Sequence, residues 1–356
     1  RLDQATTHKL LKVAPAAYRT QVNDLLLTAL ARVLCRWSQQ PAVAIQLEGH
    51  GREALFDELD ISRTMGWFTS LFPVKLTPAT EFDASIKQVK EQLRQVPNKG
   101  IGYGLLRYCA DAASQAALAT LGEPRITFNY LGQFDGDFAA DQGALFVPAP
   151  ESDGAARSEL GELSNWLSIN GQVYGGELEL SWTFSTGMYH QHTVQALADD
   201  YAAELAALIE HCSSAQHSGV TPSDFNLVNF TQAQLERLPV TPRDIVDLYP
   251  LSPMQQGIVF HNLHEPDGPA YTNQLRVDIQ QLDAERFRAA WQQTLDAHDI
   301  LRTAFVWPAQ MNAPVQIVLG NVPMPMVIHD WQGRANLEPA LDQLAREDLQ
   351  AGFALD

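Results

Sequence analysis

The segment EGHGRE, residues 48–53, places two carboxylates, an imidazole and a guanidinium within six residues, with glycines between them. It follows the short apolar stretch AVAIQLE, which predicts a strand. A carboxylate at a strand end can act as a general acid or base, and burial or a nearby guanidinium adjusts its pKa. Glycines let the backbone pass close to a thin substrate. The segment therefore indicates acid–base chemistry at Glu48, near Arg52, although a solvated strand-to-loop junction would have a similar composition.

Two further segments combine glycines with polar side chains. The stretch NKGIGYG, residues 98–104, is a glycine loop with one lysine, but it lacks the GxxxxGK[ST] spacing of a phosphate-binding loop and does not favour nucleotide binding. The stretch FNYLGQFD, residues 128–135, predicts a strand followed by a turn. Successive strand side chains point to opposite faces, so Asn129 and Tyr130 are expected on opposite sides of a sheet. Taken alone, Tyr130 also fits a core tyrosine whose hydroxyl is hydrogen-bonded.

The histidines and cysteines do not indicate a metal site. None of the ten histidines is adjacent to another, and no HExxH occurs. His190 and His192 alternate near a predicted helix start, where a surface or capping role is expected. The three cysteines are far apart and show no CxxC spacing, so neither a zinc site nor a disulfide framework is predicted.

The first part of the chain alternates predicted helices and strands, which favours an α/β fold. Apolar residues at spacings of three and four predict a helix over 17–40, and Pro73 suggests an edge or a bulge in a strand at 71–76. The remaining predicted elements are a helix at 82–97, a strand at 125–135, a hairpin at 162–185 and a helix at 192–212.

The second part follows a segment rich in Ser, Pro and Gly and again alternates strands with helices. Ser252 and Pro253 predict the start of a helix, in which Met254, Ile258 and Phe260 are expected in the core. Strands are expected at 272–280, 301–307, 314–319 and 325–331, and helices at 283–298 and from residue 338. His298 would lie at a helix C-terminus, where a partly positive imidazole suits the helix dipole.

The composition excludes several classes of protein. The chain has 356 residues, of which 46% are hydrophobic, so it can bury a substantial core. Its net charge of −18 argues against nucleic acid as a partner. No run of 18 apolar residues predicts a membrane span, and the N-terminus has no apolar signal core. These features indicate a cytoplasmic protein.

The motifs in this order resemble those of the nonribosomal peptide synthetases. EGHGRE, RTMGWFTSLFPVKL, NKGIGYG and FNYLGQFD are similar to successive motifs of an epimerization domain, and YRTQVNDLLLTAL resembles the helix that precedes them. YPLSPMQQGIVFH and HDILRTAF resemble the first two motifs of a condensation domain. The order of epimerization followed by condensation is typical of these assembly lines.

The resemblance implies a fold and a set of site residues. The fold would be chloramphenicol-acetyltransferase-like, with a mixed sheet and flanking helices in each lobe and a tunnel between two lobes. Glu48 would be one of the two acid/base groups that epimerize a carrier-bound aminoacyl or peptidyl thioester. Arg52 would steady its charge or the enolate, and Asn129 and Tyr130 would line the site. The glycines of EGHGRE would leave room for the substrate, and its other polar residues would be structural.

The resemblance also implies partners. No cofactor would bind directly, and 4′-phosphopantetheine would be presented by peptidyl carrier domains upstream and downstream. Adenylation domains of the same assembly line would select the amino acid, so this chain does not reveal which residue is epimerized. No metal is expected.

One family motif, HHxxxDG, does not occur in this chain. We therefore expect the C-terminal lobe of an epimerization domain at 1–214, a linker at 215–243 and the N-terminal part of a condensation domain at 244–356. Both domains would be incomplete, and the chain alone would be inactive. A carrier-docking scaffold without chemistry of its own is the alternative from a different class. The absence of the histidine pair disfavours a stand-alone acyltransferase.

Overall fold

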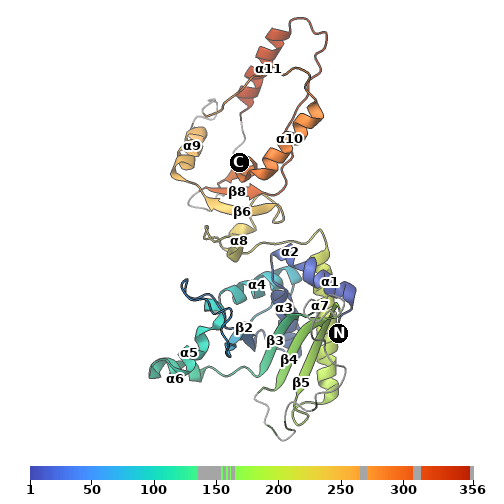
Figure 1. Ribbon diagram of the computed structural model, residues 1–356, viewed down its shortest axis with the longest axis vertical. Helices are drawn as coiled ribbons and strands as arrows, with labels where there is room; N and C mark the ends of the chain where they lie inside the picture. The colour runs from blue at the N-terminus through green and yellow to red at the C-terminus, as the bar shows by residue number, and fades with distance from the viewer. Residues whose placement is uncertain are drawn as a thin grey trace. The chain divides into compact units, whose positions relative to one another are not determined.

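The computed structural model describes residues 1–134, 154, 158, 161, 165–264, 271–307 and 314–352. The chain divides into two compact units, residues 1–220 and residues 221–356. Both units are drawn in Figure 1.

The N-terminal unit combines a five-stranded sheet with flanking helices. The strands are β1 (Val43–Gly49), β2 (Ser70–Leu76), β3 (Ile126–Gln133), β4 (Leu167–Tyr174) and β5 (Glu177–Phe184). The helices are α1 (Gln4–Lys12), α2 (Ala14–Tyr18), α3 (Val22–Ser38), α4 (Phe82–Arg94), α5 (Gly102–Tyr108), α6 (Ala112–Thr120) and α7 (Gln191–Ser213), with a 3₁₀ turn, η1, at Pro97–Gly100. All the elements predicted for this part are present, but the end of the NKGIGYG segment belongs to α5 rather than to a loop.

The sheet is mixed, in the order β2-β1-β3-β4-β5. The outer pairs, β1 with β2 and β4 with β5, are antiparallel, whereas β3 runs parallel to both of its neighbours. Pro73 therefore lies in an edge strand, as expected, because its missing N–H removes no bond from the interior of the sheet. Gly175 and Gly176 form the β4–β5 turn with φ of 61° and 74°, a left-handed pair that suits a two-residue hairpin.

Helices α3 and α7 pack together and contribute much of the core of this unit (Figure 1). The leucines of α3 at the predicted spacing, Leu25, Leu26 and Leu30, are fully buried. Tyr201 of α7 is also buried, and its hydroxyl donates a hydrogen bond to the Leu26 carbonyl at 3.2 Å. Burial of a side chain of this size contributes about 1.5–3 kcal/mol, so this helix pair anchors the sheet.

A buried ion pair joins α3 to α4. Asp24 is 1% exposed, and Arg94 donates to both of its carboxylate oxygens, at 3.0 and 2.6 Å. The same carboxylate accepts the Gln21 N–H at 2.7 Å and so caps α3. The aligned guanidinium and the cap provide the hydrogen bonds that a buried carboxylate requires.

The C-terminal unit contains a smaller sheet. Its strands are β6 (Ile245–Pro250), β7 (Thr303–Val306) and β8 (Val315–Leu319), all antiparallel, in the order β6-β8-β7. Its helices are α8 (Gln232–Leu235), α9 (Pro253–His264), α10 (Ala284–Ala297) and α11 (Leu337–Ala351), with 3₁₀ turns η3 (Pro222–Asp224) and η4 (Asp299–Arg302). Ser252 caps α9 as predicted, because its hydroxyl accepts the Gln255 N–H at 3.3 Å. His298 is the C-terminal cap of α10, also as predicted.

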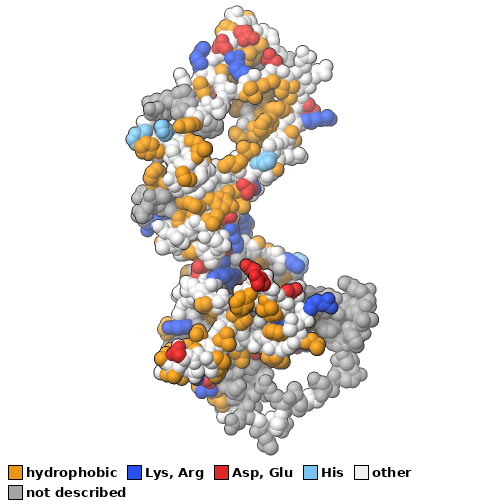
Figure 2. All heavy atoms as spheres, turned by 60° about the vertical axis from the view of Figure 1, so that its left-hand side comes forward, with side chains coloured by type: hydrophobic (Ala, Val, Ile, Leu, Met, Phe, Trp, Pro, Cys, Tyr) orange, Lys and Arg blue, Asp and Glu red, His pale blue; other side chains and the backbone are white. Residues whose placement is uncertain are grey.

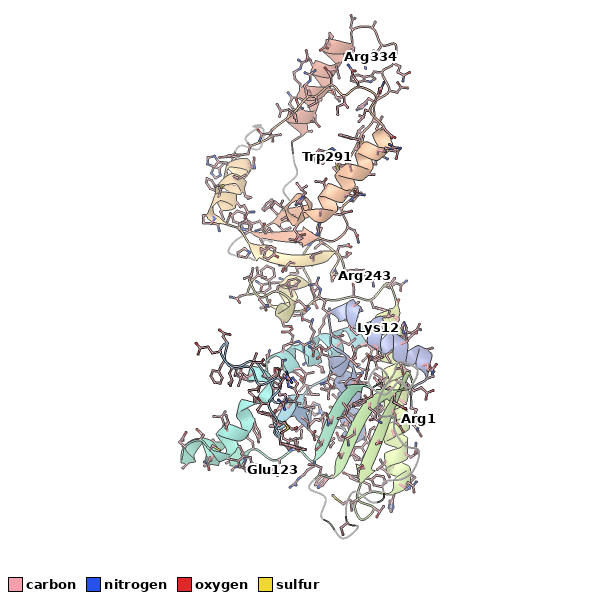
Figure 3. All side chains as sticks on the ribbon, viewed as in Figure 1. Arg1, Lys12, Glu123, Arg243, Trp291 and Arg334 are labelled. Atoms are coloured by element: carbon pink, nitrogen blue, oxygen red, sulfur yellow. The ribbon has the colours of Figure 1, made fainter. Side chains whose placement is uncertain are left out.

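Several predictions for this unit were wrong. Segments 272–280 and 325–331 are not strands, and alternate apolar residues of the first segment, such as Leu275 (86%) and Val277 (64%), are exposed. Alternation favours a strand only where a neighbouring strand accepts its backbone hydrogen bonds, and no described residue pairs with either segment. Met254 (77%) and Phe260 (53%) of α9 are exposed rather than in the core. Many apolar side chains of this unit lie on its surface (Figure 2), including Trp291 of α10, which is labelled in Figure 3.

The segment predicted as a linker, 215–243, contains the division between the units. Its start belongs to the first unit, where the Gly219 N–H donates to the Ala17 carbonyl at 2.9 Å. The rest carries only the short elements η3 and α8. No helix among the described residues is long and apolar enough to cross a membrane.

Candidate active site

Glu48 and Asn129 meet on one face of the N-terminal sheet. The parallel register that pairs Leu47 with Phe128 places Glu48 of β1 beside Asn129 of β3. The Asn129 side-chain amide donates to the Glu48 carboxylate, with Nδ2 and Oε2 2.8 Å apart. Glu48 is exposed and Asn129 is half-buried, so the carboxylate is both oriented and accessible.

The strand registers extend this pair into a row of residues across the sheet. Asn129 lies opposite Asn170 of β4, and Asn170 lies opposite Ser181 of β5. A second row lies on the same face, two residues away along each strand. It contains Gln46, Thr127, Ser168 and Thr183. The alternate residues, such as Ile45, Phe128 and Ile169, are buried in the core. One face of the sheet is therefore apolar and packed, and the other carries polar side chains around Glu48.

Arg52 does not contact Glu48. Its guanidinium donates to the Ile61 carbonyl, with Nη1 and O 2.6 Å apart, and lies over the Phe68 ring at 4.2 Å from the ring centroid. These contacts hold the loop between β1 and β2. Among the described contacts, none joins Arg52 to Glu48. The expected role of Arg52, to steady the charge of Glu48 or the enolate, stays a prediction.

The glycines of EGHGRE allow the end of β1 to pack closely against residues 68–70, at the start of β2. Gly51 has a φ of +67°, and a Cβ at this position would lie 1.5 Å from the Phe68 carbonyl oxygen. A Cβ on Gly49 would lie 2.9 Å from the Ser70 hydroxyl oxygen. Gly100 of η1, with a φ of +82°, packs against the Phe72 ring, 2.1 Å from the position of an added Cβ. The expectation that Gly49 and Gly51 leave room for substrate is therefore corrected, because the protein itself fills that space.

Glu53 links the two glycine segments. Its side chain is 15% exposed and forms ion pairs with His50, at 3.0 Å, and with Lys99, at 2.9 Å. Lys99 and Asn98 both adopt left-handed backbone conformations, with φ of 51° and 45°. Such conformations are costly for residues other than glycine, so the ion pair helps to hold η1 against the end of β1.

Tyr130 lies on the opposite face from Asn129, as the strand pattern predicted. It packs against the hydrophobic core, and burial raises the pKa of its hydroxyl. The structure thus brings Asn129 to Glu48 but places Tyr130 on the helix-covered side. Its ring packs as a core tyrosine would, but no hydrogen bond joins its hydroxyl to a described residue, and the expectation that Tyr130 lines the site stays a prediction.

Other polar residues near Glu48 were missed from the sequence. The Thr127 hydroxyl donates to the Gln46 side-chain oxygen at 3.4 Å and accepts a hydrogen bond from Asn165. Asn170 completes the row with Asn129. The polar alternation of the hairpin could have indicated Asn170, but only the parallel register of β3 and β4 shows that it lies beside the site.

Cavities lie on both faces of the sheet in the described part of the first unit, and two of them are relevant to the predicted site residues. One, of about 380 Å³, is lined by Arg1 and by residues of β5 and α7, including Trp182 and Tyr201; Arg1 is labelled in Figure 3. It contains none of the predicted site residues. The other, of about 90 Å³, lies on the polar face and is lined in part by Asn170 and Ser181. Among the described residues, no cluster of His, Cys, Asp and Glu could hold a metal ion.

Comparisons with known proteins identify the family. The condensation domain model matches residues 1–228 and 245–356, and the chain belongs to this family of nonribosomal peptide synthetase domains. The predicted family and the mixed α/β fold class are both confirmed.

Individual relatives match large parts of the chain. The chain is 35% identical over 362 residues to bacitracin synthase 3 of Bacillus licheniformis, covering 100% of this chain and 6% of that protein. It is 40% identical over 252 residues to gramicidin S synthase 1 of Brevibacillus brevis, covering 68% of this chain and 22% of that protein. The chain therefore spans less than a quarter of either relative.

A solved structure matches the fold at substantial identity. The epimerization domain from the third module of tyrocidine synthetase B is 42% identical, with a TM-score of 0.55, and the match covers 60% of this chain and 47% of that one.

Proposed function

We propose that residues 1–214 form part of an epimerization domain, in which Glu48 exchanges the α-proton of a thioester-bound aminoacyl or peptidyl group. The observation that carries this proposal is the accessible Glu48 carboxylate, held by Asn129 on the polar face of the sheet. The 42% identity to the epimerization domain of tyrocidine synthetase B supports it.

The chemistry needs one acid/base group on each side of the α-carbon. Glu48 would accept the α-proton and become a carboxylic acid, while the thioester becomes an enolate. A second group would then deliver a proton to the opposite face, which inverts the configuration. The family resemblance assigns the second role to a histidine of HHxxxDG, a motif that this chain does not contain. The chain alone is therefore proposed to be inactive.

Asn129 would act as a positioning residue. Its amide holds one carboxylate oxygen at 2.8 Å and leaves the other oxygen to face the substrate. A hydrogen bond to a charged group contributes about 1.5–3 kcal/mol, so Asn129→Leu should lower the exchange rate about 10- to 100-fold.

The proposed partners follow from a carrier-bound substrate. Carrier domains would present the acyl group on 4′-phosphopantetheine, and adenylation domains would load it. Residues 244–356 would form part of a condensation domain that accepts the D-configured product, since they follow the epimerization segment and their stretch 245–356 matches the same family model.

The family match itself favours a second candidate for the first unit. The matching model describes condensation domains, so residues 1–228 could instead belong to a domain that condenses without epimerizing. A segment that only docks carrier domains is the non-catalytic alternative. Both alternatives predict that no α-proton exchange depends on Glu48.

The test is a substitution in the full-length protein that contains this chain. Glu48→Gln keeps the size of the side chain and removes its basicity, and we expect it to abolish L-to-D conversion while the protein stays folded. Chiral analysis of the carrier-bound product measures the conversion. Glu58→Gln is the matched control, because Glu58 is an exposed carboxylate in the loop after β1. Near-normal D-product from folded Glu48→Gln would reject the assignment.

A further inference from the structure

The small cavity on the polar face of the sheet continues the row that contains Glu48. It has a volume of about 90 Å³ and is lined by Leu131, Asn170, Gly171, Gln172, Glu179 and Ser181. Asn170 is the direct neighbour of Asn129 in the parallel β3–β4 register, and Ser181 is the next residue in the row. The cavity and the Glu48–Asn129 pair therefore occupy the same face of the same sheet.

The side chains that line this cavity can donate and accept hydrogen bonds, and the one charged group among them is in an ion pair. An asparagine side chain carries two donors and one acceptor, and a serine hydroxyl can donate and accept. No hydrogen bond joins the side chain of Asn170, Gln172 or Ser181 to any residue that the structure describes. The one carboxylate of the lining, Glu179, is paired with Arg1 at 3.0 Å. Such a lining suits an amide group, which has one N–H and one C=O to offer.

The strand spacing sets the distance between this cavity and the reacting carbon. Neighbouring strands lie about 4.8 Å apart, so Asn170 is about 10 Å across the sheet from Glu48. The amino nitrogen of an aminoacyl group is only about 1.5 Å from its α-carbon and cannot reach this far. An extended peptide advances about 3.5 Å per residue, so two or three further residues would reach the cavity.

We propose that this cavity is a substrate subsite that binds an amide group of the acyl thioester, through Asn170 and Ser181. The proposal rests on the proposed epimerization at Glu48. The amide could come from the upstream peptide or from the pantetheine arm, since both are chains of amides on the reacting thioester. In either case, part of the binding energy that positions the α-carbon at Glu48 comes from a point about 10 Å away across the strands.

The experiment compares four thioesters in the full-length protein. Mass spectrometry first identifies the amino acid that the full-length protein loads onto its carrier domain, and this amino acid is used in all four thioesters. It is supplied as an aminoacyl and as a tripeptidyl thioester, each on pantetheine and on the shorter N-acetylcysteamine. The readout is deuterium wash-in at the α-carbon, expressed as the rate ratio of tripeptidyl to aminoacyl substrate and of pantetheine to N-acetylcysteamine. Asn170→Ala is the test variant. Because Asn170 is exposed, we expect this substitution to leave the fold intact, and thermal unfolding checks that it does.

Thr183→Ala is the matched control. Thr183 is exposed on the same face, in the adjacent row, and does not line the cavity. Loss of one or two neutral hydrogen bonds should lower one of the two ratios roughly tenfold in Asn170→Ala, while Thr183→Ala keeps both ratios.

Each outcome has one meaning. A fall in the tripeptidyl-to-aminoacyl ratio supports the subsite and identifies peptide amides as its ligand. A fall in the pantetheine-to-N-acetylcysteamine ratio supports it and identifies the arm. Unaltered ratios in folded Asn170→Ala overturn the subsite while leaving the role of Glu48 intact. Absence of exchange in the wild-type protein with all four substrates refutes the proposed epimerization itself.

Discussion

Replacing Gly51 with alanine should disturb the end of β1 more than its small size suggests. An alanine Cβ would lie 1.5 Å from the Phe68 carbonyl oxygen, whereas real Cβ contacts are essentially never closer than 3.0 Å. The backbone must therefore move by about 1.5 Å, and relief of such overpacking costs about 1–3 kcal/mol. The left-handed φ of +67° adds about 1–2 kcal/mol for a residue with a side chain.

The expected result is a loss of both stability and activity. Gly51→Ala should lower the free energy of unfolding by about 2–5 kcal/mol if the loop stays packed, and by less if the loop detaches. In either case the strand end that carries Glu48 shifts, and a displacement of about 1 Å at an active site can cost 10²-fold in rate. Urea denaturation measures the first effect, and α-proton exchange in the full-length protein measures the second.

Gly104→Ala is the matched control. A Cβ on Gly104 meets no atom within 4 Å, and the residue lies in α5. Alanine should therefore stabilise the helix by about 0.5–1 kcal/mol and leave the exchange rate unaltered. If Gly51→Ala matched the wild type in both stability and exchange, the close approach of Gly51 to Phe68 would not be what fixes the strand end.

Three further predictions concern the rest of the chain. Arg94→Met should lower the free energy of unfolding by about 3–5 kcal/mol, because it leaves the Asp24 carboxylate buried without its cation; a loss below about 1 kcal/mol in urea denaturation would contradict this. Burial, with a smaller effect from His217, lowers the pKa of His211, so the folded protein binds fewer protons and its stability should fall as the pH drops below about 6.5. Denaturation from pH 8 to 5.5 should show a shallower fall in His211→Gln, and identical slopes would argue against this role. The C-terminal unit should accept a D-configured donor in preference to its L-enantiomer in a condensation assay with the full-length protein, and equal rates would reject that preference.

The sequence predicted the N-terminal unit well because its elements have clear periodicity. The apolar spacing of α3, the glycine pair between β4 and β5 and Pro73 in an edge strand each have a local cause. In the C-terminal unit, segments 272–280 and 325–331 show apolar alternation without a paired strand among the described residues. Whether a segment pairs depends on residues far away in the sequence, so alternation alone could not decide it.

The candidate site could be predicted only in part. Glu48 and Asn129 were identified through their motifs, and the structure places their side chains 2.8 Å apart. The direction of Arg52 could not be foreseen, because its partners, the Ile61 carbonyl and the Phe68 ring, lie further along the chain in the loop between β1 and β2. Asn170 belongs to no motif considered from the sequence, and its place beside the site follows from the register of two parallel strands.

The most direct test of the central claim is α-proton exchange in the full-length protein, started separately from L- and D-configured thioesters in deuterated water. We expect the wild-type protein to incorporate deuterium from both enantiomers and to bring them to one mixture, and Glu48→Gln to lose this exchange from both. A wild-type protein that forms peptide bonds but incorporates no deuterium would contradict the proposed epimerization, because the first unit would then condense without epimerizing.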